Sequence, residues 1–400
     1  MLDRRRIVLG VTGGIAAYKA VEVCRRLVDA GAHVSPVLTN GALHFVGETT
    51  FSALASEPVQ RSLWDEDSPI PHTRLGQGAD LILICPATAR IISDLRTGRS
   101  HDLLTATALA TRAPVVVCPA MHTEMWEHPA VQENLQVLAD RGVQIVWPES
   151  GRLAGGDEGQ GRLADPSTIV AAVERTLGPR DMDGLEVIVT AGGTREAIDH
   201  VRVITNRSSG KQGYAVAAEA AARGASVTLV TTVDRPVPPG VAEVVQVASA
   251  ADMEAVVVPR ASDAHVIVMA AAVADFRPAS PAANKIKKDD GFTSIELEPT
   301  HDFLVDLGKA KPAHQTLVGF AAETDDLLAN AHDKLSRKSL DLVVANDVSA
   351  PEAGFEHDTN AVVILGPDGM EQTVALTDKR TVARAILDAV MAHRHRGRPG

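Results

Sequence analysis

The sequence predicts an α/β protein built from two doubly wound, Rossmann-like domains. Short β-branched runs alternate with alanine-rich amphipathic segments, which is the pattern of a parallel sheet with helices on both faces. Both halves open with a hydrophobic run that ends in two glycines, over residues 7–14 and 187–194. A Gly-Pro-Arg-Asp stretch at 178–181 lies between them, so we expect domains of residues 1–180 and 181–400.

The individual elements follow from the spacing of apolar residues. Strands are expected in the first half at Ile7–Val11, His33–Thr39, Asp80–Cys85, Pro114–Pro119 and Val143–Trp147, and helices at Ala16–Ala30, Asp102–Ala110 and Pro129–Arg141. Strands are expected in the second half at Glu186–Thr190, Ser226–Thr231, His265–Ala270, Leu317–Phe320, Leu340–Ala345 and Ala361–Leu365, and helices at Lys211–Arg223, Asp325–Ser339 and Asp378–Ala392. The last residues, 393–400, are expected to fray.

Composition narrows the classes of partner. The chain has 400 residues, a formal net charge of −12 and only 3% aromatic residues, which disfavours binding to nucleic acid or to an anionic membrane. Its three cysteines are far apart, which disfavours a disulfide scaffold or a zinc site and favours a reducing compartment. The N-terminus shows no secretory leader, and apolar runs are shorter than the roughly 18 residues of a membrane span. We therefore expect a cytoplasmic protein with no nucleic-acid or membrane partner.

The first half carries a candidate phosphate site. A strand that turns into a helix at Gly13 and Gly14 directs backbone N–H groups and the positive helix end toward an anion. Thr39 ends the second expected strand and Thr88 follows the third, at the carboxyl ends where open sheets bind ligands. The chain lacks a GxGxxG turn at this point, which disfavours the usual dinucleotide fingerprint. By themselves these residues fit ordinary loop capping equally well.

Five motifs follow one another along the first half: residues 13–19 (GGIAAYK), 71–75 (PHTRL), 79–89 (ADLILICPATA), 119–121 (PAM) and 156–162 (GDEGQGR). In this order they resemble those of the flavin-dependent cysteine decarboxylase family, and more closely the phosphopantothenoylcysteine decarboxylase domain of bifunctional coenzyme A biosynthesis enzymes. The resemblance implies a flavodoxin-like flavoprotein domain in which FMN supplies the redox chemistry. It places FMN on Gly13, Gly14, Ile15, Thr39, Pro86, Ala87 and Thr88. It makes His72, which we expect in a proline-rich loop, the catalytic histidine.

The chain departs from this family pattern at positions that matter for catalysis. His122 stands where the family has an asparagine that holds the substrate carboxylate, and an imidazole can still donate a hydrogen bond there. Gly155 stands where the family has a cysteine that donates a proton. Because glycine has no side chain that can donate a proton, we expect His122, Glu158 or water to supply this proton, or the reaction to stop at an enethiol. His101 is a further departure, in a segment where the family more often has asparagine.

The second half carries a candidate nucleotide site. The Ser-Ser-Gly-Lys turn at 208–211 opens an expected helix and forms a phosphate cradle without a Walker A pattern. Asp275 follows a strand, and a lysine cluster lies at 285–288, which is either a solvated loop or a triphosphate site. Lys334 and Lys338 share a helix face, and their repulsion of about 0.2–0.5 kcal/mol also fits two exposed lysines.

Residues 185–365 resemble the phosphopantothenate–cysteine ligase domain of the same bifunctional enzymes. The resemblance implies a nucleotide-binding ligase domain that depends on CTP and Mg²⁺, and it assigns Asn206 to the acyl-cytidylate intermediate and Lys285 to catalysis as well as to CTP. CTP positions implied by the resemblance are Asp275, Lys285, His301, Asp302, Phe303, Leu304, Phe320, Lys334 and Lys338. We expect Mg²⁺ to be held mainly by the triphosphate and water, and we name no protein ligand.

Together, the two resemblances imply a bifunctional enzyme of coenzyme A biosynthesis. It would join cysteine to 4′-phosphopantothenate with CTP and then decarboxylate the product to 4′-phosphopantetheine. Family members form trimers through the flavin domain and dimers through the ligase domain, which leads us to expect a homo-oligomer, with a dodecamer as a fair expectation. One alternative is an active ligase fused to a flavoprotein domain with altered or lost decarboxylase activity. Another is a non-catalytic flavin-binding regulatory protein.

Overall fold

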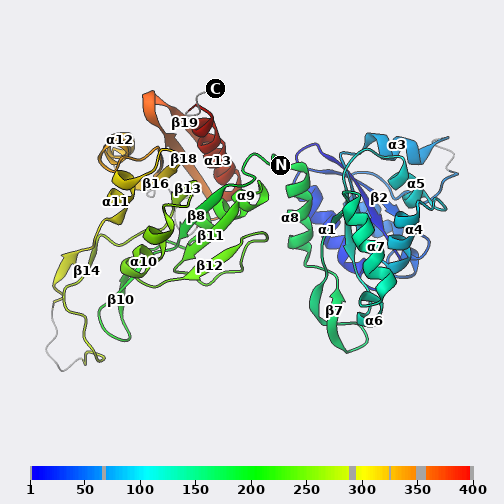
Figure 1. Cartoon of the computed structure of the whole chain (residues 1–400), viewed down its shortest axis with the longest axis horizontal. Helices are drawn as coiled ribbons and strands as arrows, with labels where there is room; N and C mark the ends of the chain where they lie inside the picture. The colour runs from blue at the N-terminus through cyan, green and yellow to red at the C-terminus, as the bar shows by residue number, and fades with distance from the viewer. Residues whose placement is uncertain (1, 65–68, 288–293, 324–325, 348–356, 397–400) are drawn as a thin grey trace. The chain divides into compact units, whose positions relative to one another are not determined.

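A computed structural model describes residues 2–64, 69–287, 294–323, 326–347 and 357–396. The chain divides into two compact units, Met1–Gly178 and Pro179–Gly400, which are blue to green and green to red in Figure 1.

The first unit is built on a five-stranded parallel sheet with the order β2-β1-β3-β4-β5. The strands are β1 (Arg6–Val11), β2 (His33–Leu38), β3 (Leu81–Ala87), β4 (Val115–Pro119) and β5 (Gln144–Ile145). This is the strand order of flavodoxin-like proteins, and it confirms the predicted doubly wound α/β class for this half. The sheet reverses its direction of winding between β1 and β3, which opens a crevice at their carboxyl ends.

Helices cover both faces of this sheet. Ile7 and Leu9 face a core formed with α1 (Ala17–Asp29) and α8 (Pro166–Leu177), whereas Val8 faces the opposite core. The helices of that opposite core are α3 (Pro71–Gly78), α4 (Ala89–Thr97), α5 (Leu103–Leu109) and α7 (Pro129–Asp140). The shorter helices are α2 (Glu48–Leu54) and α6 (Thr123–Trp126). A hairpin of β6 (Glu149–Arg152) and β7 (Glu158–Arg162) precedes α8.

The segment around His72 is a helix, so our expectation of a proline-rich loop was wrong. Pro71 is the first residue of α3. Proline is favoured at that position because its missing N–H has no intrahelical partner to lose and its fixed φ suits the helix. His72 is therefore held by regular secondary structure.

The second unit contains an eight-stranded sheet with the order β12-β11-β8-β13-β16-β17-β18-β19. Its strands are β8 (Glu186–Ala191), β11 (Ser226–Thr231), β12 (Glu243–Gln246), β13 (Val266–Met269), β16 (Thr316–Glu323), β17 (Leu342–Asp347), β18 (Thr359–Leu365) and β19 (Glu371–Asp378). The sheet is parallel from β12 to β17, but β18 and β19 are antiparallel, which corrects the expected parallel arrangement. The five residues between β18 and β19 (366–370) allow only a hairpin, since a parallel crossover needs a dozen or more.

Helices again lie on both faces of the sheet. One core contains α9 (Lys211–Ala222) and α13 (Lys379–Arg396), and the other contains α10 (Ala250–Arg260), α11 (Phe303–Ala310) and α12 (Leu327–Arg337). Two small ribbons complete the unit: β9 (Arg195–Ala197) with β10 (Val203–Thr205), and β14 (Phe276–Pro278) with β15 (Leu297–Pro299). Asp325, where we expected α12 to begin, lies outside the described residues.

The C-terminal helix is longer than predicted. Residues 393–396, which we expected to fray, form the last turn of α13. Arg394 Nη1 donates hydrogen bonds to the carbonyl oxygens of His265 at 2.8 Å and His314 at 2.7 Å, and these bonds hold the helix end. Among the helices that the structure describes, we find none that combines the length and the apolar character needed to span a membrane.

Candidate functional sites

A cavity of about 980 Å³ lies at the carboxyl end of the first unit's sheet. The turn after β1, the end of β2, the start of α4, the residues after β4 and the β6–β7 hairpin all contribute to its lining. Of the predicted FMN positions, Gly13, Gly14, Ile15, Thr39 and Thr88 line this cavity. The crevice between β1 and β3 thus brings together residues that are far apart in the sequence.

The two glycines after β1 serve different purposes. A Cβ atom at Gly13 would lie 2.7 Å from the carbonyl carbon of Gly41, so this glycine lets two loops approach closely. A Cβ atom at Gly14 would meet only Thr88 Cγ2, at 3.5 Å, which is an ordinary contact. The fold therefore has room for a side chain at position 14, and the glycine leaves that part of the cavity open. Such a cradle fits a phosphate or the edge of a flavin ring.

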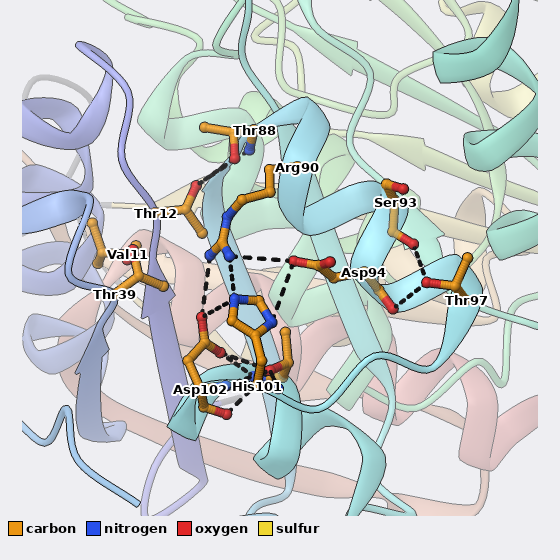
Figure 2. A network of polar contacts seen from close by, with 11 residues as sticks. Val11, Thr12, Thr39, Thr88, Arg90, Ser93, Asp94, Thr97, His101 and Asp102 are labelled. Atoms are coloured by element: carbon orange, nitrogen blue, oxygen red, sulfur yellow. Dashed lines mark hydrogen bonds and ion pairs between the residues drawn. The ribbon is translucent and has the colours of Figure 1, made fainter.

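Pro86 and Ala87 are buried and do not line the cavity. Instead they form the wall behind it. Thr12 Oγ1 donates a hydrogen bond to the carbonyl oxygen of Pro86 at 2.7 Å and accepts one from the N–H of Thr88 at 3.2 Å. Figure 2 shows Thr12 and Thr88 beside each other. These bonds tie β1 to the end of β3 and so set the position of Thr88 in the lining.

Most of the charged side chains that line this cavity are basic. Its charged side chains, histidines aside, are Lys19, Arg61, Arg90, Arg152, Arg162 and Asp102. This excess of cations suits a ligand with a phosphate group. The sequence offered no periodic signal for the arginines, because they come from segments on different elements.

Arg90 and His101 belong to a polar network at the edge of the cavity (Figure 2). The Arg90 guanidinium lies 3.1 Å from a carboxylate oxygen of Asp102 and 3.4 Å from one of Asp94, and it also contacts His101 Nε2. Asp102 caps the N-terminus of α5 and accepts a hydrogen bond from the N–H of Thr105 at 2.9 Å. Although burial raises the pKa of the Asp102 carboxyl, the bonds from Thr105 and Arg90 lower it overall. The network therefore holds a fixed charge pattern beside the cavity.

His122 also lines the cavity, immediately before α6. Its Nδ1 bonds to the Glu124 carboxylate, and its Nε2 lies 3.3 Å from a carboxylate oxygen of Asp157 in the turn of the β6–β7 hairpin. Glu124 first, and then Asp157, raise the pKa of the His122 imidazole. His72 is placed differently. It does not line the cavity of its own chain, and its buried Nδ1 has no hydrogen-bond partner within the described residues.

The second unit has a cavity of about 770 Å³. It lies at the carboxyl ends of β13, β16 and β17 and is closed by the first residues of α9 and α11 and by the last part of α12. It brings together most of the residues that the sequence nominated for this half: Asn206, Asp275, His301, Asp302, Phe303, Leu304, Phe320, Lys334 and Lys338.

Basic groups outnumber acidic ones around this second cavity. Lys334 Nζ donates a hydrogen bond to the carbonyl oxygen of Phe320 at 2.5 Å, and Lys338 Nζ lies 2.7 Å from Asp302. Lys211, Arg337 and Lys379 were not among the nominated residues, yet they line the same cavity. The surplus of positive charge is what a triphosphate needs.

Lys379 has an altered pKa. It is buried at the start of α13, and burial together with the nearby cations Lys211 and Arg235 lowers the pKa of its ammonium group to about 8. No sequence signal distinguishes this lysine, because the charges that act on it lie on other elements.

Two exposed polar residues have well-defined partners at this cavity. Asn206 donates from its side-chain amide to the carbonyl oxygen of Ala272 at 3.1 Å. His301 lies 2.9 Å from Glu254 and 3.0 Å from Asp306, and Glu254 is the larger cause of a raised pKa of the imidazole. These partners orient Asn206 and His301 without any ligand.

Lys285 is exposed and does not line the cavity of the second unit. Its loop is anchored at the next residue: the N–H of Ile286 donates to Asp199 at 3.2 Å, and Arg202 donates to the Ile286 carbonyl oxygen at 3.1 Å. Lys288, at the end of the predicted lysine cluster, lies outside the described residues. Among the residues that are described, no group of three or more His, Cys, Asp or Glu side chains could hold a metal ion.

Comparison with known proteins decides the family. The model of the flavoprotein family matches residues 1–178, and that of the DNA/pantothenate metabolism flavoprotein C-terminal domain matches residues 182–393. Over 98% of both chains, the sequence is 47% identical to the coenzyme A biosynthesis bifunctional protein CoaBC of Mycolicibacterium smegmatis. It is 44% identical to the protein of the same name from Bacillus subtilis, again over 98% of both chains. The chain belongs to the family of bifunctional coenzyme A biosynthesis proteins.

Membership of this family confirms the resemblance inferred from the motifs. Two solved structures each match about half of this chain. The C-terminal domain of a CoaBC protein is 38% identical, with a TM-score of 0.44, and covers 53% of this chain and 97% of its own. A cysteine-to-serine mutant of PPC decarboxylase complexed with pantothenoylaminoethenethiol is 30% identical, with a TM-score of 0.40, over 42% of this chain and 96% of its own.

Proposed function

We propose that this chain catalyses two consecutive steps of coenzyme A biosynthesis. The second unit joins cysteine to 4′-phosphopantothenate at the expense of CTP, and the first unit decarboxylates the resulting 4′-phosphopantothenoylcysteine to 4′-phosphopantetheine. The observation that carries the proposal is the pair of cavities, each at the carboxyl ends of a parallel sheet and each lined by residues nominated from the family motifs. Identity to bifunctional relatives over nearly the full length supports placing both activities in one cytoplasmic chain.

The first cavity would hold FMN, which supplies the two-electron oxidation and reduction that this decarboxylation requires. Gly13, Gly14 and Ile15 would bind it through the turn after β1, together with Thr39 and Thr88. Pro86 would act from the wall behind the cavity by fixing Thr88 through Thr12, and Ala87 would be part of the same wall. The basic lining would hold the phosphate groups of cofactor and substrate.

In the second cavity, Lys334 and Lys338 would hold the triphosphate of CTP, with Phe320 and residues 301–304 forming the surrounding wall. Asp275 would meet the ribose or base, and Asn206 would stabilise the acyl-cytidylate formed when the substrate carboxylate attacks the α-phosphorus. Fixed ammonium groups suit this step because negative charge gathers on phosphate oxygens in the transition state. Mg²⁺ would be bound mainly by the triphosphate and water.

Two residues with expected catalytic roles do not line the cavity of their own unit, which supports an oligomeric protein. His72 and Lys285 line neither cavity of the chain that carries them. We propose that the protein is a homo-oligomer, with a dodecamer as the expected form, in which residues of one copy complete the site of another. The substitutions His72→Asn and Lys285→Gln test the catalytic roles of these two residues. His72→Asn should retain FMN and stop carbon dioxide release, and Lys285→Gln should retain FMN and stop CMP formation.

The overall proposal is tested with the purified full chain, which should be yellow. With 4′-phosphopantothenate, cysteine and CTP, it should form CMP and pyrophosphate in equal amounts and then carbon dioxide and 4′-phosphopantetheine. Absence of CMP from folded protein would refute the ligase and favour a non-catalytic flavin-binding protein. Gly155, which stands where the family has a cysteine, favours a second candidate function. In this candidate the ligase is active and the flavoprotein half has altered activity. For that candidate, 4′-phosphopantothenoylcysteine would yield no carbon dioxide, or would yield an enethiol that goes no further.

A further inference from the structure

The β6–β7 hairpin is fixed against the segment that carries His122. The N–H of Met121 donates to the carbonyl oxygen of Gly161 at 2.9 Å, and Thr123 Oγ1 donates to that of Gln160 at 2.9 Å. Trp126 Nε1 adds a bond to the side chain of Gln160 at 3.1 Å. Three consecutive contacts therefore hold β7 alongside α6, with the hairpin turn beside His122.

Two glycines of β7 make this approach possible. A Cβ atom at Gly159 would lie 2.2 Å from Thr123 Oγ1, and one at Gly161 would lie 2.3 Å from the carbonyl oxygen of Met121. Gly161 also has a φ of +115°, which an L side chain rarely adopts. Larger residues would push β7 away, so the sequence is built for contact between the hairpin and residues 121–123.

This contact places the imidazole of His122 over Gly155. A Cβ atom at position 155 would lie 3.4 Å from His122 Nε2 and 3.4 Å from a carboxylate oxygen of Asp157. The position from which a side chain at 155 would start is thus already faced by a nitrogen that can carry a proton. The side chain of His122 is 38% exposed and lines the cavity, so the imidazole borders the space that a bound molecule would occupy.

We propose that His122 Nε2 donates the proton that completes the decarboxylation, in the role that the family resemblance gives to a cysteine at position 155. This inference rests on the proposed decarboxylase function of the first unit. His122 is then a catalytic residue, and Glu124 and Asp157 are positioning residues that act through it.

After carbon dioxide has left, the enethiol has a carbon–carbon double bond that must gain two electrons and two hydrogens. A bound reduced flavin would supply one carbon with a hydride and both electrons, and it would owe its reduction to the earlier oxidation of the substrate thiol. The other carbon receives a proton as the Nε2–H bond of His122 breaks, which leaves a neutral imidazole. Solvent then reprotonates the imidazole, and the cycle has no net oxidation or reduction.

The other donors that the chain offers are poorly placed. All three cysteines are buried and line neither cavity, and burial raises the pKa of Cys24 to about 11. Glu158 is exposed on β7 and does not line the cavity. His101 does line it, but its Nε2 faces the guanidinium of Arg90 and must accept rather than donate there.

The charges that face His122 favour the protonated imidazole. Glu124 on its own helix bonds to Nδ1, and Asp157 on the hairpin lies beside Nε2. Arg152 and Arg162 of the hairpin strands line the same cavity as the nearest cations of that element. The two carboxylates dominate, and the pKa of His122 is raised. A group whose protonated form is favoured by its neighbours and that lines the cavity meets the chemical needs of a general acid.

The test follows the product ratio in a single turnover of the full, flavin-loaded chain with 4′-phosphopantothenoylcysteine. In His122→Asn, the ratio of 4′-phosphopantetheine to enethiol should fall at least about tenfold when the two proteins are compared at equal release of carbon dioxide. The absorbance of the flavin should show that it stays reduced. Adding Gly155→Cys to that variant should restore the ratio, because the structure accommodates a Cβ there without strain. His122→Asn with Gly155→Ala is the matched control, and it should not recover.

A second measurement does not depend on catalysis. In the flavin-free chain, histidine NMR should give His122 a pKa above the ordinary value of about 6.5. Glu124→Gln and Asp157→Asn should each lower that pKa and move the loss of saturated product to lower pH by the same interval. A wild-type product ratio in His122→Asn, or an unaltered pKa in Glu124→Gln, would overturn the proposal. Absence of carbon dioxide from the wild-type chain would instead refute the decarboxylase function itself.

Discussion

The ammonium group of Lys338 lies 2.7 Å from a carboxylate oxygen of Asp302, and both side chains line the cavity of the second unit. Only 12% of the Lys338 side chain is exposed. Asp302 orients the ammonium group of Lys338 beside the cavity. A bound ligand with several negative charges would attract the same ammonium group more strongly than one carboxylate does. The pair is therefore a candidate contact for the triphosphate.

Substituting Lys338 with glutamine should weaken CTP binding by about 10- to 100-fold, since a hydrogen bond to a charged group contributes about 1.5–3 kcal/mol. Isothermal titration calorimetry with CTP would measure the loss. Lys309→Gln is a matched control, because this lysine is exposed on α11 and does not line the cavity. Equal affinities of the two variants would remove Lys338 from the site.

Lys379 should make nucleotide binding depend on pH. Its pKa is lowered to about 8, so the ammonium group becomes neutral as pH rises through that value. A bound polyanion raises this pKa again, and binding should therefore take up protons near pH 8 and weaken above it. Calorimetry in buffers of different ionisation enthalpy measures the uptake. The uptake should vanish in Lys379→Met, and its persistence there would assign it to another group.

The two glycines after β1 should respond differently to alanine. Gly13→Ala should destabilise the first unit, because its Cβ would lie 2.7 Å from the backbone of Gly41 and overpacking of this kind costs about 1–3 kcal/mol. Gly14→Ala should leave the thermal midpoint almost unchanged and reduce the FMN that copurifies, because its Cβ meets only Thr88 and enters the cavity. Flavin absorbance and thermal unfolding distinguish the two effects. Full flavin occupancy in a folded Gly14→Ala protein would argue against a ligand at this turn.

Arg223 should contribute strongly to the stability of the second unit. Its guanidinium is 2% exposed and bonds to Asp181, with Nε at 2.9 Å from one carboxylate oxygen, and to Asp388 at 2.7 Å. Arg223→Met removes several charged hydrogen bonds and should lower the free energy of unfolding by about 2 kcal/mol or more. Asp388→Asn, at a side chain 57% exposed, should cost less than about 1 kcal/mol. Urea unfolding provides both values, and an unaffected Arg223→Met would contradict this role.

The sequence predicted the buried strands well, for a physical reason. Strands such as β3 are buried at every residue, so they appear as continuous aliphatic runs. By contrast, β19 is exposed at most of its residues and owes its structure to pairing with β18. Helix α8 did have a local signal, since Asp165 caps it and Pro166 is its first residue.

The sequence could place a residue at a cavity where that residue belongs to a short motif beside the end of a strand. Gly13 and Thr88 line the cavity of the first unit and Asp302 lines that of the second, whereas their roles in binding a ligand stay predictions. Residues such as Arg61 and Lys379 were not predictable, because only tertiary contacts bring them to the cavities. The contact between His122 and Gly155 could not be read from spacing either, since it depends on two distant glycines of one hairpin.

The bonds from Arg223 to Asp181 and Asp388 have a consequence for how such a protein arises and diversifies. They join the first residues of the second unit to its last helix, so this unit is clasped shut by its own two ends. A gene fusion or fission at the junction near Gly178 would leave both the clasp and the sheet intact. The bonds that hold the two ends of the second unit together are therefore internal to that unit, and a fusion or a separation at this junction changes none of them.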